Sequence, residues 1–177
     1  MADASKTNAA RLLEARGIPH RVRVYDAGQA FHSADEAATL LGVPGGSVLK
    51  TLVVLRETPG RARPLLVLVP SDRQLDMKRL GRALGEKRLR MASQREAERL
   101  TGLKVGGISA LAVRAGAFEV LVDASAARWA EVHVSGGVRG VDLELTVDDL
   151  LAATGGRLVE ISGRGSSADG DGEGTSG

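Results

Sequence analysis

One lysine and two glycine loops are the segments of this sequence whose residue types could do chemistry. Lys50 interrupts the aliphatic run 48–55, and a buried ammonium is costly unless it is paired or faces a cavity. The lysine is therefore either a functional amine or a side chain that snorkels to water at the start of a strand. The glycine pairs at 106–107 and 136–137 either expose backbone N–H groups that can hold an oxyanion or a phosphate, or form two ordinary turns.

The other polar residues give weaker signals. Asp142 follows the second glycine loop and is either a partner for Lys50 or a carboxylate at a strand edge with no role. His20, His32 and His133 are better explained as structural or exposed residues than as catalytic ones. The sequence has no cysteine and no nucleophile elbow, phosphate loop or dinucleotide fingerprint. We therefore expect no metal, no cofactor and no cysteine nucleophile on the protein.

Length and composition indicate one globular domain. The chain has 177 residues, of which 43% are hydrophobic and 26% charged, which is ordinary for a folded protein. The longest aliphatic run, 65–69, is far too short for a membrane span, and residues 1–7 show no signal peptide. We expect a cytoplasmic protein without membrane contact. Its expected parts are a flexible N-terminus (1–7), a folded domain (8–161) and a disordered Gly/Ser/Asp tail (162–177).

Hydrophobic periodicity and turn signals predict interspersed helices and strands. Capping boxes at Ser33/Glu36 and Ser93/Glu96 mark two helix starts. Several neighbouring strands look hairpin-linked, which favours a mixed, barrel-like sheet flanked by helices, in the α/β (α+β) class, over a doubly wound parallel sheet. Helices are expected over 5–16, 33–42, 76–84, 93–102 and 146–153, and strands over 20–25, 47–56, 64–70, 89–91, 118–122, 130–134, 141–145 and 157–161.

Basic residues are concentrated between positions 78 and 95, although the net charge is only +2. This stretch is either a solvated helix face or a patch that contacts phosphates. Only four residues are aromatic, which disfavours modules that stack single-stranded bases. If nucleic acid is bound, we expect its backbone to be contacted by Lys78, Arg79, Arg82, Lys87 and Arg88.

Four segments in order resemble the YbaK family of free-standing editing proteins, relatives of the editing domain in bacterial prolyl-tRNA synthetases. They are residues 49–54, 74–85, 101–109 and 134–145, and the resemblance spans about residues 8–161. It implies the YbaK editing-domain fold and the release of a wrongly attached amino acid from tRNA. In the YbaK branch the substrate is Cys-tRNA(Pro), with Cys-tRNA(Cys) as a further candidate. The mechanism proposed for that branch is attack by the substrate's own sulfur on its ester, which releases a thiolactone.

The resemblance also implies roles for individual residues. Lys50, Asp142 and Tyr25 take the catalytic positions, and Lys50 is the family's signature lysine, thought to position the ester or the terminal adenosine. Substrate binding is expected at the glycine loops, through Gly106, Gly107, Ser109, Ser135, Gly136 and Gly137.

This chain departs from the family pattern at Ala110, where a proline usually follows the loop serine. Loss of the fixed φ of proline can loosen the pocket wall. Two other functions remain open: release of alanine or serine from mischarged tRNA by water attack, and non-catalytic binding of tRNA or a synthetase. Expected partners are mischarged tRNA(Pro) and, because the protein has little surface for a whole tRNA, prolyl-tRNA synthetase.

Overall fold

A computed structural model describes residues 6–28, 33–60 and 62–164. Four of the five α-helices have the expected bounds to within one or two residues, whereas the first, expected over 5–16, begins at Asn8 because Thr7 caps it. Ser33 and Ser93 each cap a helix in a reciprocal capping box with Glu36 and Glu96, and glycines in the left-handed conformation end four of the helices. The helices are α1 (Asn8–Ala15), α2 (Ala34–Leu41), α3 (Met77–Leu84), α4 (Gln94–Thr101) and α5 (Val147–Thr154), with 3-10 turns η2 (Gly45–Ser47) and η3 (Ala124–Arg128).

Eight strands form one mixed sheet, as the hairpin signals predict. Its hydrogen-bonded order is β1-β8-β7-β2-β3-β6-β9, and β5 adds to β2. Among the described residues this path stays open, with β1 and β9 at its ends. Its strands are β1 (Arg21–Val24), β2 (Val48–Arg56), β3 (Leu65–Pro70), β5 (Leu89–Met91), β6 (Glu119–Asp123), β7 (Val132–Ser135), β8 (Val141–Leu145) and β9 (Arg157–Val159).

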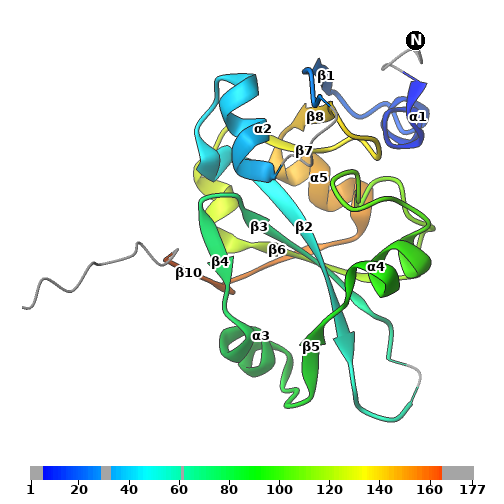
Figure 1. Cartoon of the computed structure of the whole chain (residues 1–177), viewed down its shortest axis with the longest axis vertical. Coiled ribbons are helices and arrows are strands. Elements are labelled where there is room, and N and C mark those ends of the chain that lie inside the picture. The colour runs from blue at the N-terminus through cyan, green and yellow to red at the C-terminus, as the bar shows by residue number, and fades with distance from the viewer. Residues whose placement is uncertain (1–5, 29–32, 61, 165–177) are drawn as a thin grey trace, which may run out of the picture.

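The sheet separates two hydrophobic clusters. Strand residues alternate between its faces, so in β2 Val53 joins the larger cluster and Val54 the smaller one. Helices α1, α4 and α5 supply buried residues to the larger cluster, whereas α3 supplies Leu80 to the smaller one. Figure 1 shows α5 and α3 on different sides of the long central strand β2. The core is aliphatic, as the scarcity of aromatic residues requires.

The middle of β2 lacks a strand neighbour on one side. One edge of β2 pairs with β3 along most of its length. On the other edge, residues 48–49 of β2 pair with β7 and residues 54–56 pair with β5. Between them, the only bond to a neighbouring segment that we find among the described residues is from the Ala92 N–H to the Val53 carbonyl, at 2.9 Å. The sheet therefore has a gap beside Lys50–Val53, the segment that carries the predicted functional lysine.

The C-terminal boundary differs from the expectation. Ser162–Arg164 forms strand β10, which pairs with β4 (Arg73–Leu75) in a separate two-stranded sheet. The expected disordered tail therefore cannot begin at 162; residues 165–177 lie outside the described part. Neither short strand has an apolar alternation of its own. The two strands are stabilised by pairing with each other, so the local sequence did not predict them. None of the helices in the described ranges is long and apolar enough to cross a membrane.

Candidate active site

A pocket of about 410 Å³ opens at the gap in the sheet. Its walls come from segments far apart in the sequence: the residue after β1, the N-terminal half of α2, β2, the chain from the end of β5 into α4, the first glycine loop, and the facing ends of β7 and β8. Most of the lining is apolar, and the polar groups are few. The lining residues that matter below are Tyr25, Ser33, Lys50, Thr51, Val53, Ala92, Gly106, Ile108, Ser135 and Asp142.

Lys50 is half-buried in this pocket. Its Nζ donates a hydrogen bond of 3.4 Å to the carbonyl oxygen of Ser71, the residue after β3. Burial lowers the pKa of the Lys50 ammonium, and the negative charges of Asp35 and Asp72 partly offset this effect. The lysine is thus held at the pocket rather than extended into water, which favours the functional interpretation of its position.

Asp142 and Tyr25 form a buried acid–phenol pair in the same pocket. The Tyr25 hydroxyl donates to Asp142 Oδ1 at 3.3 Å, and the Asp142 side chain is only 4% exposed. Burial raises the pKa of Asp142 to about 6, although the bond from Tyr25 acts to lower it. Burial also raises the pKa of Tyr25. At neutral pH the pocket therefore holds a mostly ionised, poorly solvated carboxylate that can bind a cation.

The two glycine loops are packed against each other. A Cβ on Gly107 would lie 3.2 Å from the backbone of Val138. The Arg139 guanidinium donates two bonds, of 2.9 and 3.2 Å, to the carbonyl of Val105. Gly106, with φ +92°, is exposed at the pocket. Glycine here permits both the close approach of the loops and the positive φ.

The structure brings together five of the nine predicted catalytic and substrate-binding residues. The five that line the pocket are Tyr25, Lys50, Gly106, Ser135 and Asp142. Ser135 and Asp142 are direct neighbours across β7 and β8.

The other four predicted residues support the pocket from behind its surface. Gly107 packs the two loops together, and Gly136 donates to the Val141 carbonyl at 2.7 Å. Gly137 donates to Ser135 Oγ at 3.2 Å. Ser109 is buried, and its hydroxyl accepts from the Leu111 N–H at 3.2 Å. Direct substrate contact by these four stays a prediction.

Sequence reasoning missed the apolar wall of the pocket and its edge at α2. Val53, Ala92 and Ile108 line it, and so does Ser33. The capping box explains Ser33 fully without any further role, and single apolar residues carry no local signal of facing a cavity. Of the three histidines, His133 is buried, His20 Nδ1 lies 2.9 Å from the Ile18 carbonyl oxygen, and His32 lies outside the described residues.

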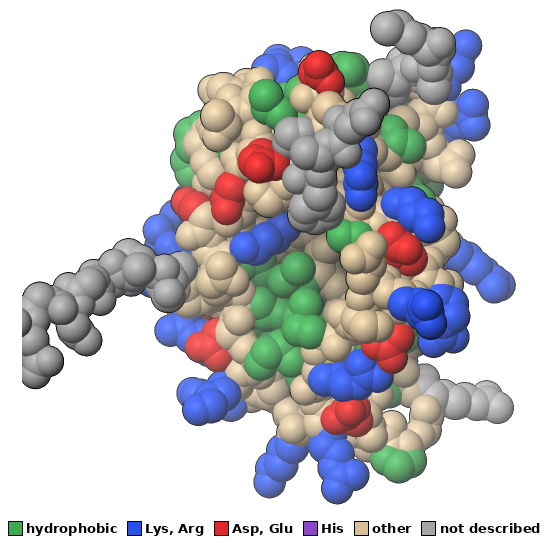
Figure 2. Space-filling model, in the orientation of Figure 1, with side chains coloured by type: hydrophobic (Ala, Val, Ile, Leu, Met, Phe, Trp, Pro, Cys, Tyr) green, Lys and Arg blue, Asp and Glu red, His purple; other side chains and the backbone are tan. Residues whose placement is uncertain are grey.

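The predicted phosphate-contacting residues lie away from this pocket, on α3 and the loop after it. All five, Lys78, Arg79, Arg82, Lys87 and Arg88, are exposed. Arg79 donates to the Ser162 carbonyl at 3.1 Å. Figure 2 shows Lys and Arg side chains along the lower part of the molecule, where Figure 1 places α3 and β5. Their contact with RNA stays a prediction.

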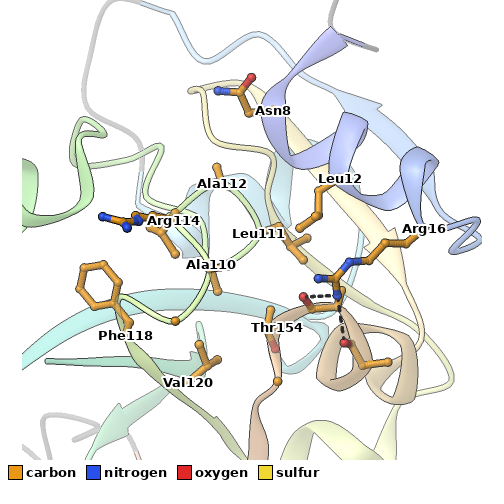
Figure 3. Close-up of a pocket in the computed structure, with 16 residues that line it drawn as sticks. Asn8, Leu12, Arg16, Ala110, Leu111, Ala112, Arg114, Phe118, Val120 and Thr154 are labelled. Carbon is orange, nitrogen blue, oxygen red and sulfur yellow. Dashed lines mark hydrogen bonds between the residues drawn. The ribbon is translucent and has the colours of Figure 1, made fainter. Parts of the chain in front are cut away.

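A second hollow, of about 450 Å³, lies between α1, the 110–118 segment and the end of α5 (Figure 3). Arg16 crosses it to donate bonds of 3.3 and 3.1 Å to the carbonyls of Ala152 and Ala153. Ala110, the residue in place of the family proline, lines this hollow. Its described lining residues include no carboxylate, histidine or lysine. It therefore lacks the acid–base groups that the pocket at the sheet gap holds.

Comparison with known proteins agrees with this geometry. Over 157 residues the chain is 31% identical to an Enterococcus faecalis protein named "Putative Cys-tRNA(Pro)/Cys-tRNA(Cys) deacylase EbsC", covering 89% of this chain and 93% of the relative. A shorter stretch of 74 residues is 38% identical to a proline–tRNA ligase of Geobacter metallireducens, covering 42% of this chain but only 12% of the ligase.

Solved structures give the same fold. A crystal structure of "a putative trans-editing enzyme for prolyl tRNA synthetase" superposes with a TM-score of 0.77 at 26% identity, covering 92% of this chain and 99% of the other. The hypothetical protein APE2540 superposes with a TM-score of 0.77 at 29% identity, covering 88% and 99%. Residues 29–153 match the model of the aminoacyl-tRNA editing domain. With its Lys50 pocket and this match, the chain belongs to the aminoacyl-tRNA editing domain family, as its four ordered motifs predicted.

Proposed function

We propose that this protein releases cysteine from Cys-tRNA(Pro) in trans, with the thiol of the substrate as the nucleophile. The observation that carries this proposal is that one largely apolar pocket is lined by both a half-buried amine, that of Lys50, and a buried carboxylate, that of Asp142. Family membership makes the chain an aminoacyl-tRNA deacylase. The choice of cysteine and of tRNA(Pro) is supported by the names of the similar proteins.

The pocket can bind each charged part of an aminoacyl ester. The Asp142 carboxylate accepts hydrogen bonds from the α-ammonium group of the amino acid. The Lys50 ammonium offers a positive charge to the ester oxygens or to the terminal nucleotide. The exposed backbone at Gly106 is a candidate oxyanion donor. These contacts orient an ester that is already activated, and orientation alone can supply several kcal/mol of the barrier.

The chemical step needs no nucleophile from the protein. The cysteine sulfur attacks its own ester carbonyl, a carbon–sulfur bond forms, and the bond to the ribose oxygen breaks. The ribose oxygen takes up a proton as the thiol loses one, so the products are free tRNA and a cyclic thiolactone. A chain with no cysteine can thus use covalent chemistry supplied by the substrate.

The apolar wall around Val53, Ala92 and Ile108 suits any small side chain. This observation favours alanine or serine as the second candidate, with water as the nucleophile. A hydrophobic pocket separates side chains that differ by one methylene by only about 1–3 kcal/mol. If cysteine is preferred far beyond this limit, the preference must come from its thiol chemistry rather than from fit.

A deacylation panel tests both candidates. The substrates are tRNA(Pro) charged with cysteine, alanine, serine or 2-aminobutyrate, which has the size of cysteine but no thiol. We expect release of cysteine alone, and a fall of about 100-fold in kcat/KM for Lys50→Met. Lys104→Met is the matched control, because the Lys104 side chain is 82% exposed and pairs with Glu98 at the surface.

Three outcomes would count against the proposal. Equal rates for Lys50→Met and wild type would remove the lysine from the mechanism. Equal rates for cysteine and 2-aminobutyrate would replace the thiol by water. Binding of tRNA with no release of any amino acid would leave only a binding module.

We also propose a partnership with prolyl-tRNA synthetase. It predicts that this protein, the synthetase and tRNA(Pro) elute as one complex on gel filtration.

A further inference from the structure

A small hollow of about 170 Å³ lies on the flank of the molecule beside β4 and β10. Three arginines from separate elements line it: Arg73 from β4, Arg79 from α3 and Arg128 from η3. A fourth, Arg164 of β10, lies directly opposite Arg73 in the two-stranded sheet. Like charges placed directly opposite each other across two strands are destabilising unless something offsets them.

The carboxylates at this hollow do not offset the arginines fully. Asp123 is 1% exposed, and its two oxygens accept bonds from the N–H groups of Ile161, Ser162 and Ser125 and from the Ser125 hydroxyl. Burial acts to raise the pKa of Asp123, but these bonds lower it below its ordinary value. The carboxylate is therefore committed to the protein backbone. The other lining carboxylate, Glu160, is 85% exposed, and its Oε1 lies 3.7 Å from Arg79 Nη1. Outside the lining, Asp76 Oδ2 lies 3.6 Å from Arg79 Nε, so carboxylates are found beside Arg79 but not beside the Arg73 or Arg128 side chains among the described residues.

The protein holds two of the arginines in place. Arg73 Nη1 donates to the Ser162 hydroxyl at 3.4 Å, and Arg79 Nη1 donates to the Ser162 carbonyl at 3.1 Å. Each bond uses one of the five N–H donors of a guanidinium. Arg128 makes no side-chain hydrogen bond or ion pair that we find with the described residues. The hollow thus presents two guanidinium groups that the protein holds in place and a third, that of Arg128, with unused donors, and the fork geometry of these groups matches phosphate oxygens.

This hollow lies close to the lysine of the active-site pocket. The Ser71 carbonyl accepts the bond from Lys50, and Arg73 is two residues further along the chain. Two residues span at most about 7 Å. Figure 2 shows Lys and Arg side chains at this edge of the molecule, where the chain leaves β10. A polynucleotide whose end reaches Lys50 could therefore pass the hollow within its last nucleotides.

We propose that Arg73, Arg79 and Arg128 form a binding site for one backbone phosphate of the substrate RNA. The identification of that phosphate with tRNA rests on the proposed function, whereas the anion site itself does not. The site adds Arg73 and Arg128 to the contacts expected from the sequence and places them beside the pocket. Because it binds the backbone and not the bases, it would raise affinity without reading the sequence.

The test measures binding of an uncharged RNA hairpin that copies a tRNA acceptor stem and ends in single-stranded CCA. Fluorescence anisotropy gives Kd between 50 and 200 mM KCl for the wild type, Arg73→Gln/Arg128→Gln and Arg128→Gln. Arg11→Gln is the matched control, because Arg11 is exposed on α1. We expect the double variant to bind about tenfold more weakly at 50 mM. Its slope of log K against log salt should fall by roughly 0.7–0.9 in total, because the three arginines contact one phosphate.

Thermal unfolding of each variant checks its fold. The double variant loses the Arg73–Ser162 bond, and this loss can destabilise β10. Arg128→Gln removes no bond that we find among the described residues, so its RNA affinity tests the site without that effect. A double variant with the Kd and salt slope of Arg11→Gln would overturn the inference. So would stabilisation of the wild type by inorganic phosphate together with unchanged RNA affinity in the double variant. Absence of RNA binding by the wild type would overturn the tRNA substrate as well, so the two failures are distinguishable.

Discussion

Replacement of Asp142 by asparagine should shift the unfolding free energy, relative to the wild type, in favour of the variant as the pH rises from acidic to neutral. Burial raises the pKa of the Asp142 carboxyl from 3.8 to about 6 in the folded protein. A carboxyl with a raised pKa favours folding below its unfolded pKa, and this advantage disappears as the pH rises from about 4 to about 6. Asparagine cannot ionise, so the variant does not lose stability over this range.

The size of the change in unfolding free energy follows from the difference between the Asp142 pKa values in the folded and unfolded protein. A difference of about 2 pKa units corresponds to about 3 kcal/mol of unfolding free energy. We expect Asp142→Asn to gain about 2 kcal/mol relative to the wild type between pH 4 and pH 7.5, whatever its absolute stability. The change with pH is the informative quantity, because burying an unpaired amide group could itself cost about 1–3 kcal/mol at both values.

Urea unfolding at pH 4 and pH 7.5 measures this difference. Asp148→Asn is the matched control, because Asp148 is exposed in the first turn of α5. Loss of its charge should destabilise slightly, by about 0.3–1 kcal/mol, since acidic groups are favourable at a helix N-terminus. An equal difference in unfolding free energy between Asp142→Asn and the wild type at both pH values would falsify the account of a desolvated carboxylate. If deacylation survives in the variant, Asp142 does not bind the α-ammonium group.

Two further substitutions test packing in the rest of the fold. Arg56 is 8% exposed at its side chain and binds Glu86 at 2.7 Å and Glu119 at 2.5 Å. Arg56→Met should remove the bond to Glu86 and leave Glu119 with the more distant Arg157, at 3.6 Å, and so lower the unfolding free energy by about 3 kcal/mol; a loss below 1 kcal/mol in urea unfolding would contradict this. A Cβ on Gly46 would lie 2.8 Å from Trp129 Cζ2, so Gly46→Ala should cost about 1–3 kcal/mol and change the fluorescence of this single tryptophan, whereas an unchanged spectrum and stability would show that the ring moves freely.

Most elements could be predicted because their signals are local. The capping boxes place α2 and α4, and the alternation of β8 places its two faces. The strands β4 and β10 could not be predicted, since three residues carry no usable periodicity and each is stabilised by a partner about 90 residues away. The same holds for Asp123, whose role depends on backbone N–H groups at positions 161 and 162.

The site was predictable to a different degree. Residue type and spacing left Lys50 with two interpretations, and the resemblance carried by the four ordered motifs implied the functional one, which stays a prediction. The structure adds what no motif contains, namely that β5 and β7 leave residues 50–53 without a strand neighbour on the side opposite β3. Strand register between distant segments decides where such an opening falls. Arg79 was expected from the sequence to contact phosphate, but its neighbours Arg73 and Arg128 in the small hollow were not, because the three arginines come from separate elements.

The interruption of the ladder beside β2 has a consequence for mutational scanning. The carbonyl of Val53 points toward that interruption, and backbone groups alternate along a strand, so the peptide groups of Thr51 point the same way. A ligand lying there can form hydrogen bonds with the main-chain N–H and carbonyl groups of Thr51. Every replacement of Thr51 except proline leaves these groups intact. Alanine scanning of this strand would therefore underestimate its share in recognition, and backbone amide-to-ester exchange at position 51 would reveal it.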